Sequence, residues 1–171
     1  MIQVNEGTFV QEGSNIMLFQ KGYIGQWYPS RFYENGQMFS CAEQYMMYRK
    51  AILFNDYKTA TEIMMCSEPK VMQDLGRRTT NFNQQLWDDN KEQIVFKGNF
   101  LKFSQNEILL KKLLLTKGYE LAEAAPWDKI WGIGLGPEDS RSFDKSLWEG
   151  ENLLGKTITK VRKVLEKVDI I

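Results

Sequence analysis

Glu43 and Lys50 are the residues whose types and spacing first suggest chemistry. They stand in the segment FSCAEQYMMYRKA, residues 39–51, whose pattern predicts a helix. Seven residues apart, they share one helix face at an axial separation of about 10 Å. Helical side chains lean toward the N-terminus, so the Lys50 amine can reach toward a ligand bound above the first turn. A carboxylate and an amine placed in this way can act on a ligand between them.

Both residues also have a structural interpretation. Ser40 stands three residues before Glu43, which is the spacing of a capping box, and an acid in the first turn suits the helix dipole. Lys50 fits a solvated lysine at an exposed helix edge, although its helix is otherwise rich in Met, Tyr and Ala. The spacing therefore predicts a capping box and leaves a catalytic role open for both residues.

Asp128 is the second acidic candidate, and it lies between Trp127 and Trp131 in AAPWDKIWGIGLG. An aspartate in a tight turn usually caps its own backbone, whereas an acid flanked by aromatic rings can bind or polarise a flat ring. The glycines of WGIGLG do not make a dinucleotide fingerprint, because Pro137 stands where that pattern needs glycine. We expect them to allow a sharp turn or a close approach of the backbone to a ligand.

Tryptophans and an arginine pair complete the candidates. Trp87 and Trp131 are either core residues or platforms for a ligand ring, and periodicity does not separate the two roles. Arg77, with Arg78, follows a predicted helix stop in LGRRTTNF, where it serves either as a phosphate ligand or as an ordinary surface residue.

The composition excludes several classes of function. There is no histidine, which rules out Ser-His-Asp and Cys-His catalysis and disfavours a zinc or iron catalytic site. Lys plus Arg equals Asp plus Glu at 22 each, without the basic excess of a protein built to hold long nucleic acid. The two cysteines have no metal-binding spacing. We expect no metal and no cofactor, with acid–base chemistry left to carboxylates, lysine, tyrosine or water.

The same sequence predicts a cytoplasmic protein of one domain. Its 171 residues suit a single domain over 1–171, and it shows neither a signal peptide nor the ~18-residue apolar run of a membrane helix. Predicted strands are 16–20, 37–39 and 119–125. Predicted helices are 41–55, 57–66, a third from 69 with Gly76 as its C-cap, a long helix capped by Asn81 or Asn83, 106–118, and a last helix from about 152. These elements predict a compact, mainly helical α+β domain with a few short strands.

Six stretches, in this order and at these distances, resemble one family. They are WYPSRF (27–32), FSCAEQYMMYRKAILFND (39–56), LGRRTTNF (75–82) with Trp87, GNFLKFSQN (98–106), LAEAAPWDKIWGIGL (121–135) and LWEGENLLG (147–155). Together they resemble the NADAR family, also called YbiA-like, over about residues 26–163. The resemblance implies a mainly helical α+β domain and N-glycosidase activity.

The resemblance also implies substrates and a pocket. YbiA-like members cleave the bond between a ribose C1 and a nitrogen in early riboflavin intermediates, which are pyrimidine amines carrying ribose 5-phosphate. Other members remove ADP-ribose from guanine in nucleic acid, so nucleic acid is expected only as a modified-base substrate, and no membrane partner is expected. The pocket residues that the matching motifs imply are Glu43, Lys50, Trp87, Asp128, Trp131, Gly132 and Asn152.

These residues suggest a mechanism. Breaking a glycosidic C–N bond builds positive charge on the ribose and negative charge on the base. We expect Glu43 to face the ribose and Asp128 to activate water or orient the ribose hydroxyls. Lys50 either holds charge near phosphate or hydroxyl groups or forms a Schiff base with the opened sugar, while Trp87 and Trp131 stack on the base. A module that binds ADP-ribose or another nucleotide without cleaving it remains the alternative from another class.

Overall fold

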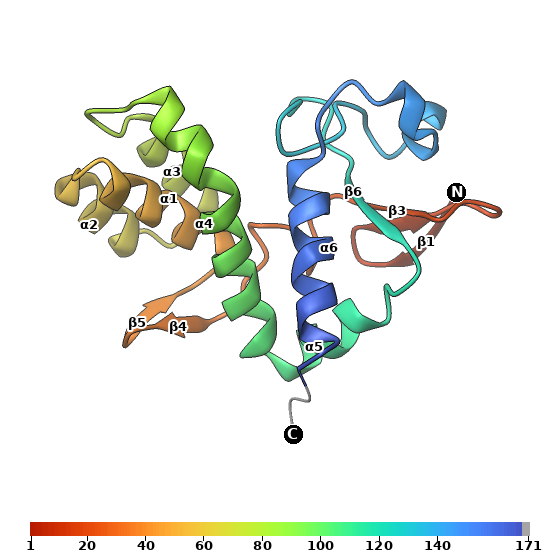
Figure 1. Ribbon diagram of the computed structural model, residues 1–171, viewed down its shortest axis with the longest axis horizontal. Coiled ribbons are helices and arrows are strands. Elements are labelled where there is room, and N and C mark those ends of the chain that lie inside the picture. Colours follow the sequence, from red (N-terminus) through yellow and green to blue (C-terminus); the bar gives the residue numbers. More distant parts are fainter. Residues whose placement is uncertain (169–171) are drawn as a thin grey trace. The chain divides into compact units, whose positions relative to one another are not determined.

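The computed structural model describes residues 1–168, and the chain divides into two compact units. One unit combines residues 1–28 with the chain from residue 107 onward, and the other is the continuous segment 29–106. Figure 1 shows both units, with α-helices and short strands in each. The predicted α+β class with mainly helical content is confirmed.

The unit of residues 29–106 begins with a hairpin and continues as four helices. Strands β4 (Phe32–Glu34) and β5 (Gln37–Phe39) pair antiparallel. Asn35 and Gly36 both have positive φ, as a tight hairpin turn requires. The helices follow in the order α1 (Ala42–Leu53), α2 (Tyr57–Met65), α3 (Pro69–Arg77) and α4 (Gln84–Ser104).

Aromatic rings join the hairpin to α1 in this unit. Phe32 and Phe39 from the two strands are buried against Tyr45 of α1, and the Phe39 and Tyr45 ring centroids lie 5.0 Å apart. Gly98 of α4 leaves room for this tyrosine, because a Cβ there would stand 2.6 Å from Tyr45 Cδ1. Gly98, a residue of low helix propensity, is thus the residue that lets α4 approach α1.

A cap residue explains where α4 begins, and the C-cap predicted for α3 is wrong. Asn83 caps α4, with its Oδ1 accepting from Leu86 N at 2.8 Å, as one of the two predicted alternatives. Gly76 is not the C-cap of α3, because the helix continues to Arg77. A Cβ on Gly76 would overlap the Met47 side chain, so this glycine serves the packing of α3 on α1.

The other unit is built on a four-stranded sheet with the order β1-β2-β3-β6. Strands β1 (Ile2–Asn5), β2 (Thr8–Val10) and β3 (Ile16–Phe19) pair antiparallel in sequence order. Strand β6 (Glu120–Glu123) pairs parallel with β3. The sequence predicted β3 and β6 but not their pairing.

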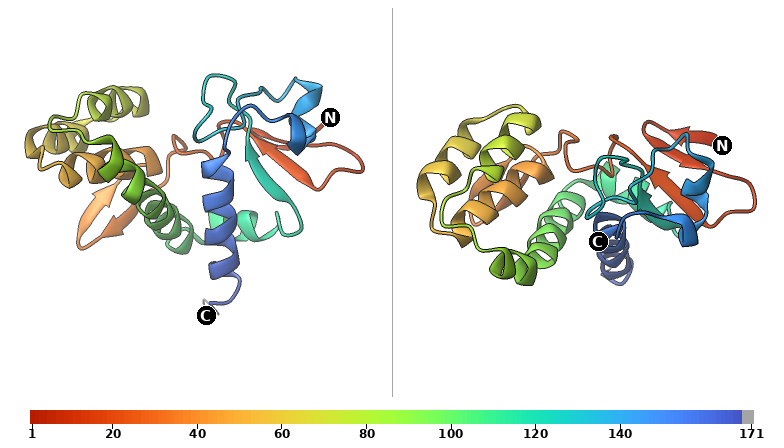
Figure 2. Two further views of the ribbon diagram at one scale, coloured as in Figure 1. Left: turned by 45° about the horizontal axis from the view of Figure 1, so that its top comes forward. Right: turned by 90° about the horizontal axis from the view of Figure 1, so that it is seen from above.

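Helices and a long loop complete this unit. Helix α5 (Glu107–Leu114) precedes β6, and α6 (Leu153–Leu165) lies beside β6 in both views of Figure 2. A Cβ on Gly155 would overlap the Leu121 carbonyl oxygen, which is why α6 can pack so closely on the strand. Between β6 and α6 the chain forms loops and two short 3-10 turns, Ser140–Phe143 and Lys145–Leu147, that the sequence did not predict.

One hydrophobic cluster of this unit lies between the sheet and the loop. Buried side chains from β3, the end of β6 and the glycine-rich loop make one cluster: Ile16, Leu18, Ala122, Ala124, Ile133 and Leu135. No helix within residues 1–168 is both long enough and apolar enough to cross a bilayer.

Candidate active site

Lys50 lies at the centre of a group of charged and aromatic side chains in the unit of residues 29–106. Its Nζ stands 4.8 Å from the ring centroid of Phe82 and 5.2 Å from that of Trp87, within range of cation–π attraction. Glu43 and Arg77 are close enough to act electrostatically on the same amine. We call Glu43, Lys50, Arg77, Phe82 and Trp87 the Lys50 cluster.

The surroundings of Lys50 lower the pKa of its amine. Burial is the largest cause, the positive charge of Arg77 adds to it, and the negative charge of Glu43 opposes both. A lysine with a lowered pKa carries more of the neutral, nucleophilic amine at a given pH than an exposed lysine does. The structure thus provides the condition that a covalent role for Lys50 requires and that sequence cannot show.

Glu43 is buried at 4% exposure near the start of α1, and the predicted capping box is wrong. Cys41 is the N-cap, without a side-chain cap hydrogen bond. Gln44 takes the place expected of Glu43: its Oε1 accepts from Ser40 N at 2.8 Å and from Ser40 Oγ at 3.0 Å. A buried carboxylate near a lysine is typical of a paired charge.

Gln44 also holds the start of α1 in place. Its Nε2 donates to the Ile63 carbonyl at 3.1 Å and to the Cys66 carbonyl at 3.3 Å, at the C-terminal end of α2. The side chain is buried and its amide bonds at both ends. The residue next to Glu43 therefore fixes the helix turn that carries the carboxylate.

Asp56 positions the segment that brings Phe82 to Lys50. Its Oδ1 caps α2 by accepting from Thr59 N at 3.0 Å, and its Oδ2 accepts from Thr80 N at 2.8 Å. These backbone hydrogen bonds lower the pKa of Asp56 to about 2. The Phe54 and Phe82 rings pack with centroids 5.1 Å apart.

Sequence reasoning missed both Asp56 and Phe82 as contributors to the site. Asp56 stands at the break before α2, so its N-cap role was visible in the sequence. Its second bond, to Thr80, joins residues 24 positions apart and left no local signal. Phe82 lies in the LGRRTTNF stretch but is 44% exposed, which is ordinary for a surface aromatic.

Asp128 lies in the other unit, in the loop after β6. Its Oδ1 accepts from Ile130 N at 2.9 Å and from Trp131 N at 2.8 Å. This is the backbone-capping arrangement that an aspartate in a tight turn predicts. The carboxylate thereby fixes the turn that presents the half-buried Trp131.

Asn152 joins the same loop to β6 through side-chain hydrogen bonds. It is fully buried with φ 54°, its Oδ1 accepts from Glu123 N at 3.0 Å, and its Nδ2 donates to the Leu121 carbonyl at 3.0 Å. Its backbone N–H donates to the Gly132 carbonyl at 3.0 Å. A Cβ on Gly132 would stand 2.9 Å from the Asp128 carbonyl oxygen, so the loop closes only with glycine there.

The predicted site residues therefore fall into two groups. Within residues 29–106 the structure brings together Glu43, Lys50, Arg77 and Trp87. In the other unit it brings together Asp128, Trp131, Gly132 and Asn152. Among residues 1–168, no group of three or more Cys, Asp or Glu side chains is arranged to hold a metal ion.

Comparison with known proteins identifies one domain family and several N-glycosidases that are similar to this chain. The sequence matches the NADAR domain over residues 9–166. It is 48% identical over 145 residues to N-glycosidase R617 of Acanthamoeba polyphaga mimivirus, covering 82% of this chain and 85% of that protein. It is 29% identical over 131 residues to N-glycosidase YbiA of Escherichia coli, covering 77% and 73%.

A solved structure and one further relative also match this chain. The NMR structure of E. coli YbiA matches with a TM-score of 0.73 and 26% identity over 92% of this chain and 88% of that one. The riboflavin biosynthesis protein PYRR of Arabidopsis thaliana is 30% identical over 110 residues, which is 62% of this chain and 16% of that protein.

Proposed function

The chain belongs to the NADAR family, and on this premise we propose that it hydrolyses the bond between a ribose C1 and a nitrogen in a phosphorylated ribosylaminopyrimidine, an early intermediate of riboflavin synthesis. It is an enzyme of the N-glycosidase class, the activity for which its relatives R617 and YbiA are named. The finer choice of substrate draws support from the resemblance to YbiA-like proteins and from the match to part of a riboflavin biosynthesis protein.

The observation that carries the proposal is the Lys50 cluster. It combines a buried carboxylate, an amine with a lowered pKa and the face of a buried tryptophan within one unit of the fold. The structural alternatives for these positions are a solvated lysine and a capping glutamate. These alternatives do not account for the burial of Glu43 or for the rings beside the Lys50 amine.

Glu43 is proposed to face the ribose. When the C1–N bond breaks, its electron pair stays with the base nitrogen, which takes up a proton, and positive charge develops at C1. A buried carboxylate stabilises that charge more strongly than an exposed one, because little water screens it. Water then adds its oxygen to C1 and loses a proton, which completes the hydrolysis.

Lys50 is proposed to act on the same sugar in one of two ways. As an ammonium it holds the substrate phosphate or hydroxyls. As a neutral amine it adds to C1 of the ring-opened substrate and displaces the pyrimidine amine, which leaves with a proton; the resulting imine on Lys50 is then hydrolysed by water to restore lysine and release the sugar. The lowered pKa of Lys50 favours the second route.

The remaining predicted residues have proposed roles in binding. Trp87 offers a ring face to the pyrimidine, and Arg77 offers a guanidinium, 67% exposed, to the phosphate. Trp131 is proposed as a second ring for the base. Asp128, Gly132 and Asn152 hold the loop that carries Trp131, and a direct catalytic role for Asp128 stays a proposal that the variant Asp128→Asn tests.

The deciding experiment is a paired hydrolysis assay. Wild-type protein and Glu43→Gln are each given the ribosylaminopyrimidine 5'-phosphate and, separately, ADP-ribosylated guanine in single-stranded DNA. Cleavage of the first, lost by at least 100-fold in Glu43→Gln at unchanged circular dichroism, supports the proposal. Lys58→Gln, on the exposed face of α2, serves as the charge-changed control and should cleave as wild type does.

Other outcomes reassign the substrate or the class. Cleavage of the ADP-ribosylated guanine alone would move the enzyme to the reversal of nucleic-acid modification. Binding of ADP-ribose with no cleavage of either substrate would favour a non-catalytic nucleotide-binding module. Borohydride reduction during turnover tests the covalent route, and the absence of a substrate-dependent mass adduct on Lys50 would exclude it. We propose that the reaction takes place in the cytoplasm.

A further inference from the structure

The faces of two aromatic rings meet at the amine of Lys50. Its Nζ lies over the Phe82 ring, 4.8 Å from the centroid, and over the Trp87 ring, 5.2 Å from that centroid. Trp87 belongs to α4, and Phe82 to the segment just before this helix. Because the face of an aromatic ring is its negative part, positive charge at this atom is attracted by both rings. The proposed function uses the Trp87 face for the substrate base but gives the Phe82 ring no task.

Phe82 is held beside the amine by contacts behind it. Its ring packs on the buried Phe54 ring, with centroids 5.1 Å apart. Two residues earlier, Thr80 donates its backbone N–H to Asp56 Oδ2 at 2.8 Å. The Phe82 side chain is partly exposed, so its own burial contributes only part of what a core ring would gain. These contacts fix a ring face next to Lys50 at a place where it remains open to a ligand.

The other surroundings of Lys50 disfavour the charged form of its amine. Burial is the largest cause of its lowered pKa, Arg77 of α3 lowers the pKa further, and Glu43 of α1 opposes both. Cation–π attraction acts in the same sense as Glu43, because it favours the ammonium over the neutral amine. The attraction is stronger where water is excluded from the cation. The two rings are therefore well placed to hold positive charge on an amine that burial would otherwise leave neutral.

We propose that Phe82 is a positioning residue of the active site, whose ring face holds the positive charge on the Lys50 Nζ and keeps this atom beside Trp87. The inference rests on the proposed function, because that function gives Lys50 its place in the reaction. Both roles proposed for Lys50 put a cation at this atom. One is the ammonium that holds phosphate or hydroxyls, and the other is the imine on Lys50 once it has taken up a proton from solvent.

A purely hydrophobic role for Phe82 leads to different expectations. If the side chain only shields the amine from water, leucine should replace it, since leucine keeps the apolar bulk. If the ring face matters, leucine should fail and tyrosine should succeed. Trifluorophenylalanine in place of Phe82 separates the two roles further. It keeps the ring, but its fluorine atoms withdraw electron density from the face that attracts the cation.

The first measurement is an NMR titration of the lysine Cε signals in isotope-labelled protein without substrate. The Lys50 signal is identified by its absence in Lys50→Met. In Phe82→Leu the protonation constant of the Lys50 amine should fall by about 2- to 5-fold, the range expected for the loss of one cation–π contact. Phe82→Tyr should titrate as wild type does, and the trifluorophenylalanine protein should lie between wild type and Phe82→Leu.

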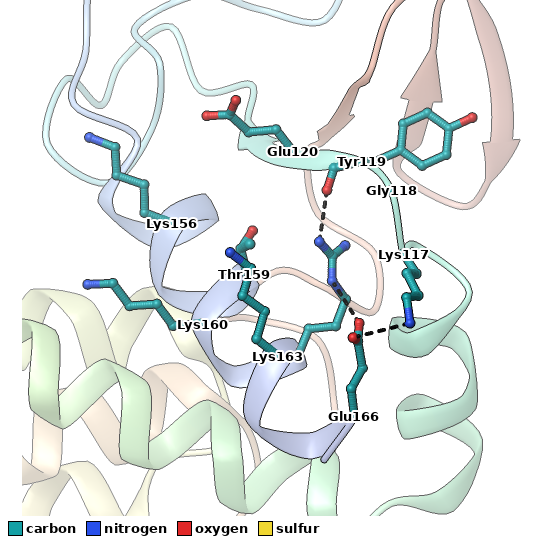
Figure 3. Close-up of a pocket in the computed structure, with 10 residues that line it drawn as sticks. Lys117, Gly118, Tyr119, Glu120, Lys156, Thr159, Lys160, Lys163 and Glu166 are labelled. Atoms are coloured by element: carbon teal, nitrogen blue, oxygen red, sulfur yellow. Dashed lines mark hydrogen bonds and ion pairs between the residues drawn. The ribbon is translucent and has the colours of Figure 1, made fainter.

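Lysines of the other unit provide the reference in the same spectra. Lys156 and Lys163 are exposed and line an open groove of about 580 Å³ along α6. Figure 3 shows both side chains among the residues that line this groove. Their signals should titrate alike in all variants, which separates a local effect at Lys50 from a change of fold. Phe96→Leu is the matched control for the loss of a ring, because Phe96 stacks on Phe100 within α4.

The second measurement is the pH profile of hydrolysis of the ribosylaminopyrimidine 5'-phosphate. In Phe82→Leu, at unchanged circular dichroism, the limb of kcat that reports Lys50 should move to lower pH in step with the NMR titration. This direction holds for either role of the amine, because the loss of the ring weakens proton binding in both. Phe82→Tyr should restore the wild-type profile, and Phe96→Leu should not alter it.

The two measurements separate failure of this inference from failure of the proposed function. An unchanged Lys50 titration in Phe82→Leu would overturn the inference, and so would a changed titration with an unchanged pH profile. If wild type did not cleave the substrate, the proposed function would be refuted. The titration without substrate would then still decide whether Phe82 holds the charge on Lys50.

Discussion

Lys50 is the residue at which stability and the proposed chemistry oppose one another. Its amine is partly buried, and burial lowers its pKa, so the folded state disfavours the charged form. Between the folded and the unfolded pKa values the unfolded chain binds more protons, and the protein gains stability as the pH rises through that window. At neutral pH the lysine therefore costs stability, and a catalytic role would explain its presence.

Lys50→Met should abolish hydrolysis without weakening the fold. Met keeps the aliphatic stem beside Phe82 and Trp87 and removes the charge that burial disfavours. We expect a thermal midpoint equal to or above that of wild type and a loss of kcat of about 100-fold or more. Differential scanning fluorimetry and the ribosylaminopyrimidine assay measure the two effects, with Lys58→Met as the exposed control. A clear drop in the midpoint would mean that Lys50 is chiefly structural.

Lys102 should give the protein a pH-dependent stability near neutrality. It is fully buried in α4, and burial lowers its pKa to about 7, with Cys41 opposing the shift. Above pH 7 the folded state has released a proton that the unfolded state still holds. The free energy of unfolding should therefore rise from pH 7 to 8.5 by up to about 1.4 kcal/mol per pH unit.

The check for Lys102 is urea denaturation at pH 6, 7, 8 and 8.5, with wild type beside Lys102→Met. The variant lacks the titrating group, so its stability should depend little on pH over this range and should exceed that of wild type most at pH 6. Parallel curves for the two proteins would show that Lys102 does not titrate with a lowered pKa.

At this scale the sequence offered candidate site residues but did not predict all of their contacts. Glu43 and Lys50 were found from helix spacing, yet the same spacing wrongly predicted a capping box. Glutamine at 44 reaches the Ser40 backbone as well as glutamate at 43 would, and only the packed structure decides between them. The rings beside Lys50 come from Phe82 and Trp87, whose approach depends on tertiary packing that periodicity does not report.

Among the elements, the segment between α3 and α4 is held in part by Asp56, the N-cap of α2. Asp56 caps α2 and also accepts the Thr80 N–H, so one carboxylate fixes two backbone segments. Its lowered pKa contributes stability that is present above the unfolded value near 3.9 and is lost as the pH falls toward about 2. The segment that carries Phe82 should loosen with it.

Asp56→Ala should cost about 1–2 kcal/mol of stability at pH 7, since an N-cap and a second backbone bond are lost together. Urea denaturation measures this cost. Hydrolysis should also slow, because Phe82 is no longer held beside Lys50. Asp89→Ala, at an exposed position of α4, is the matched control and should change neither property. If Asp56→Ala and Asp89→Ala unfold alike, Asp56 does not hold this segment.

The boundaries of α1 and α2 were predictable, whereas α5 ends at Leu114, before the predicted stop at 118, and two glycines inside helices serve packing. The predicted helices at 41–55 and 57–66 correspond closely to α1 and α2, because their apolar spacing and the break at Asp56 are local. Gly76 was predicted to be a helix C-cap, and Gly98 has a low helix propensity. Each nevertheless lies inside a helix, where a neighbouring side chain leaves no room for a Cβ. Their role is visible only once Met47 and Tyr45 are in place.

For the whole molecule, the sequence predicted the α+β class but not the topology. The pairing of β3 with β6 joins strands whose local patterns say nothing about each other. The prediction of one domain over 1–171 stays a prediction. Each of the two compact units has its own buried cluster, one around Phe32, Phe39 and Tyr45 and the other around Ile16 and Leu18.

The segment 29–106 should fold when it is expressed alone. It is continuous in sequence and contains the complete Phe32, Phe39 and Tyr45 cluster with α1 to α4. We expect a helical circular dichroism spectrum and a cooperative thermal transition. A coil-like spectrum for this fragment, with the full chain folded under the same conditions, would contradict the expectation.

The parallel pairing of β3 with β6 also determines when the sheet can be completed during translation. Gln20, at the end of β3, and Ala124, at the end of β6, are hydrogen-bonded across 104 positions of the chain. A ribosome adding about 5–20 residues per second delivers the later strand on the order of ten seconds after the earlier one. Throughout that interval the nascent chain presents the apolar strand IMLF with one edge unpaired. We therefore expect the yield of this protein in cells to depend on translation speed and on chaperones that shield β3 until its partner arrives.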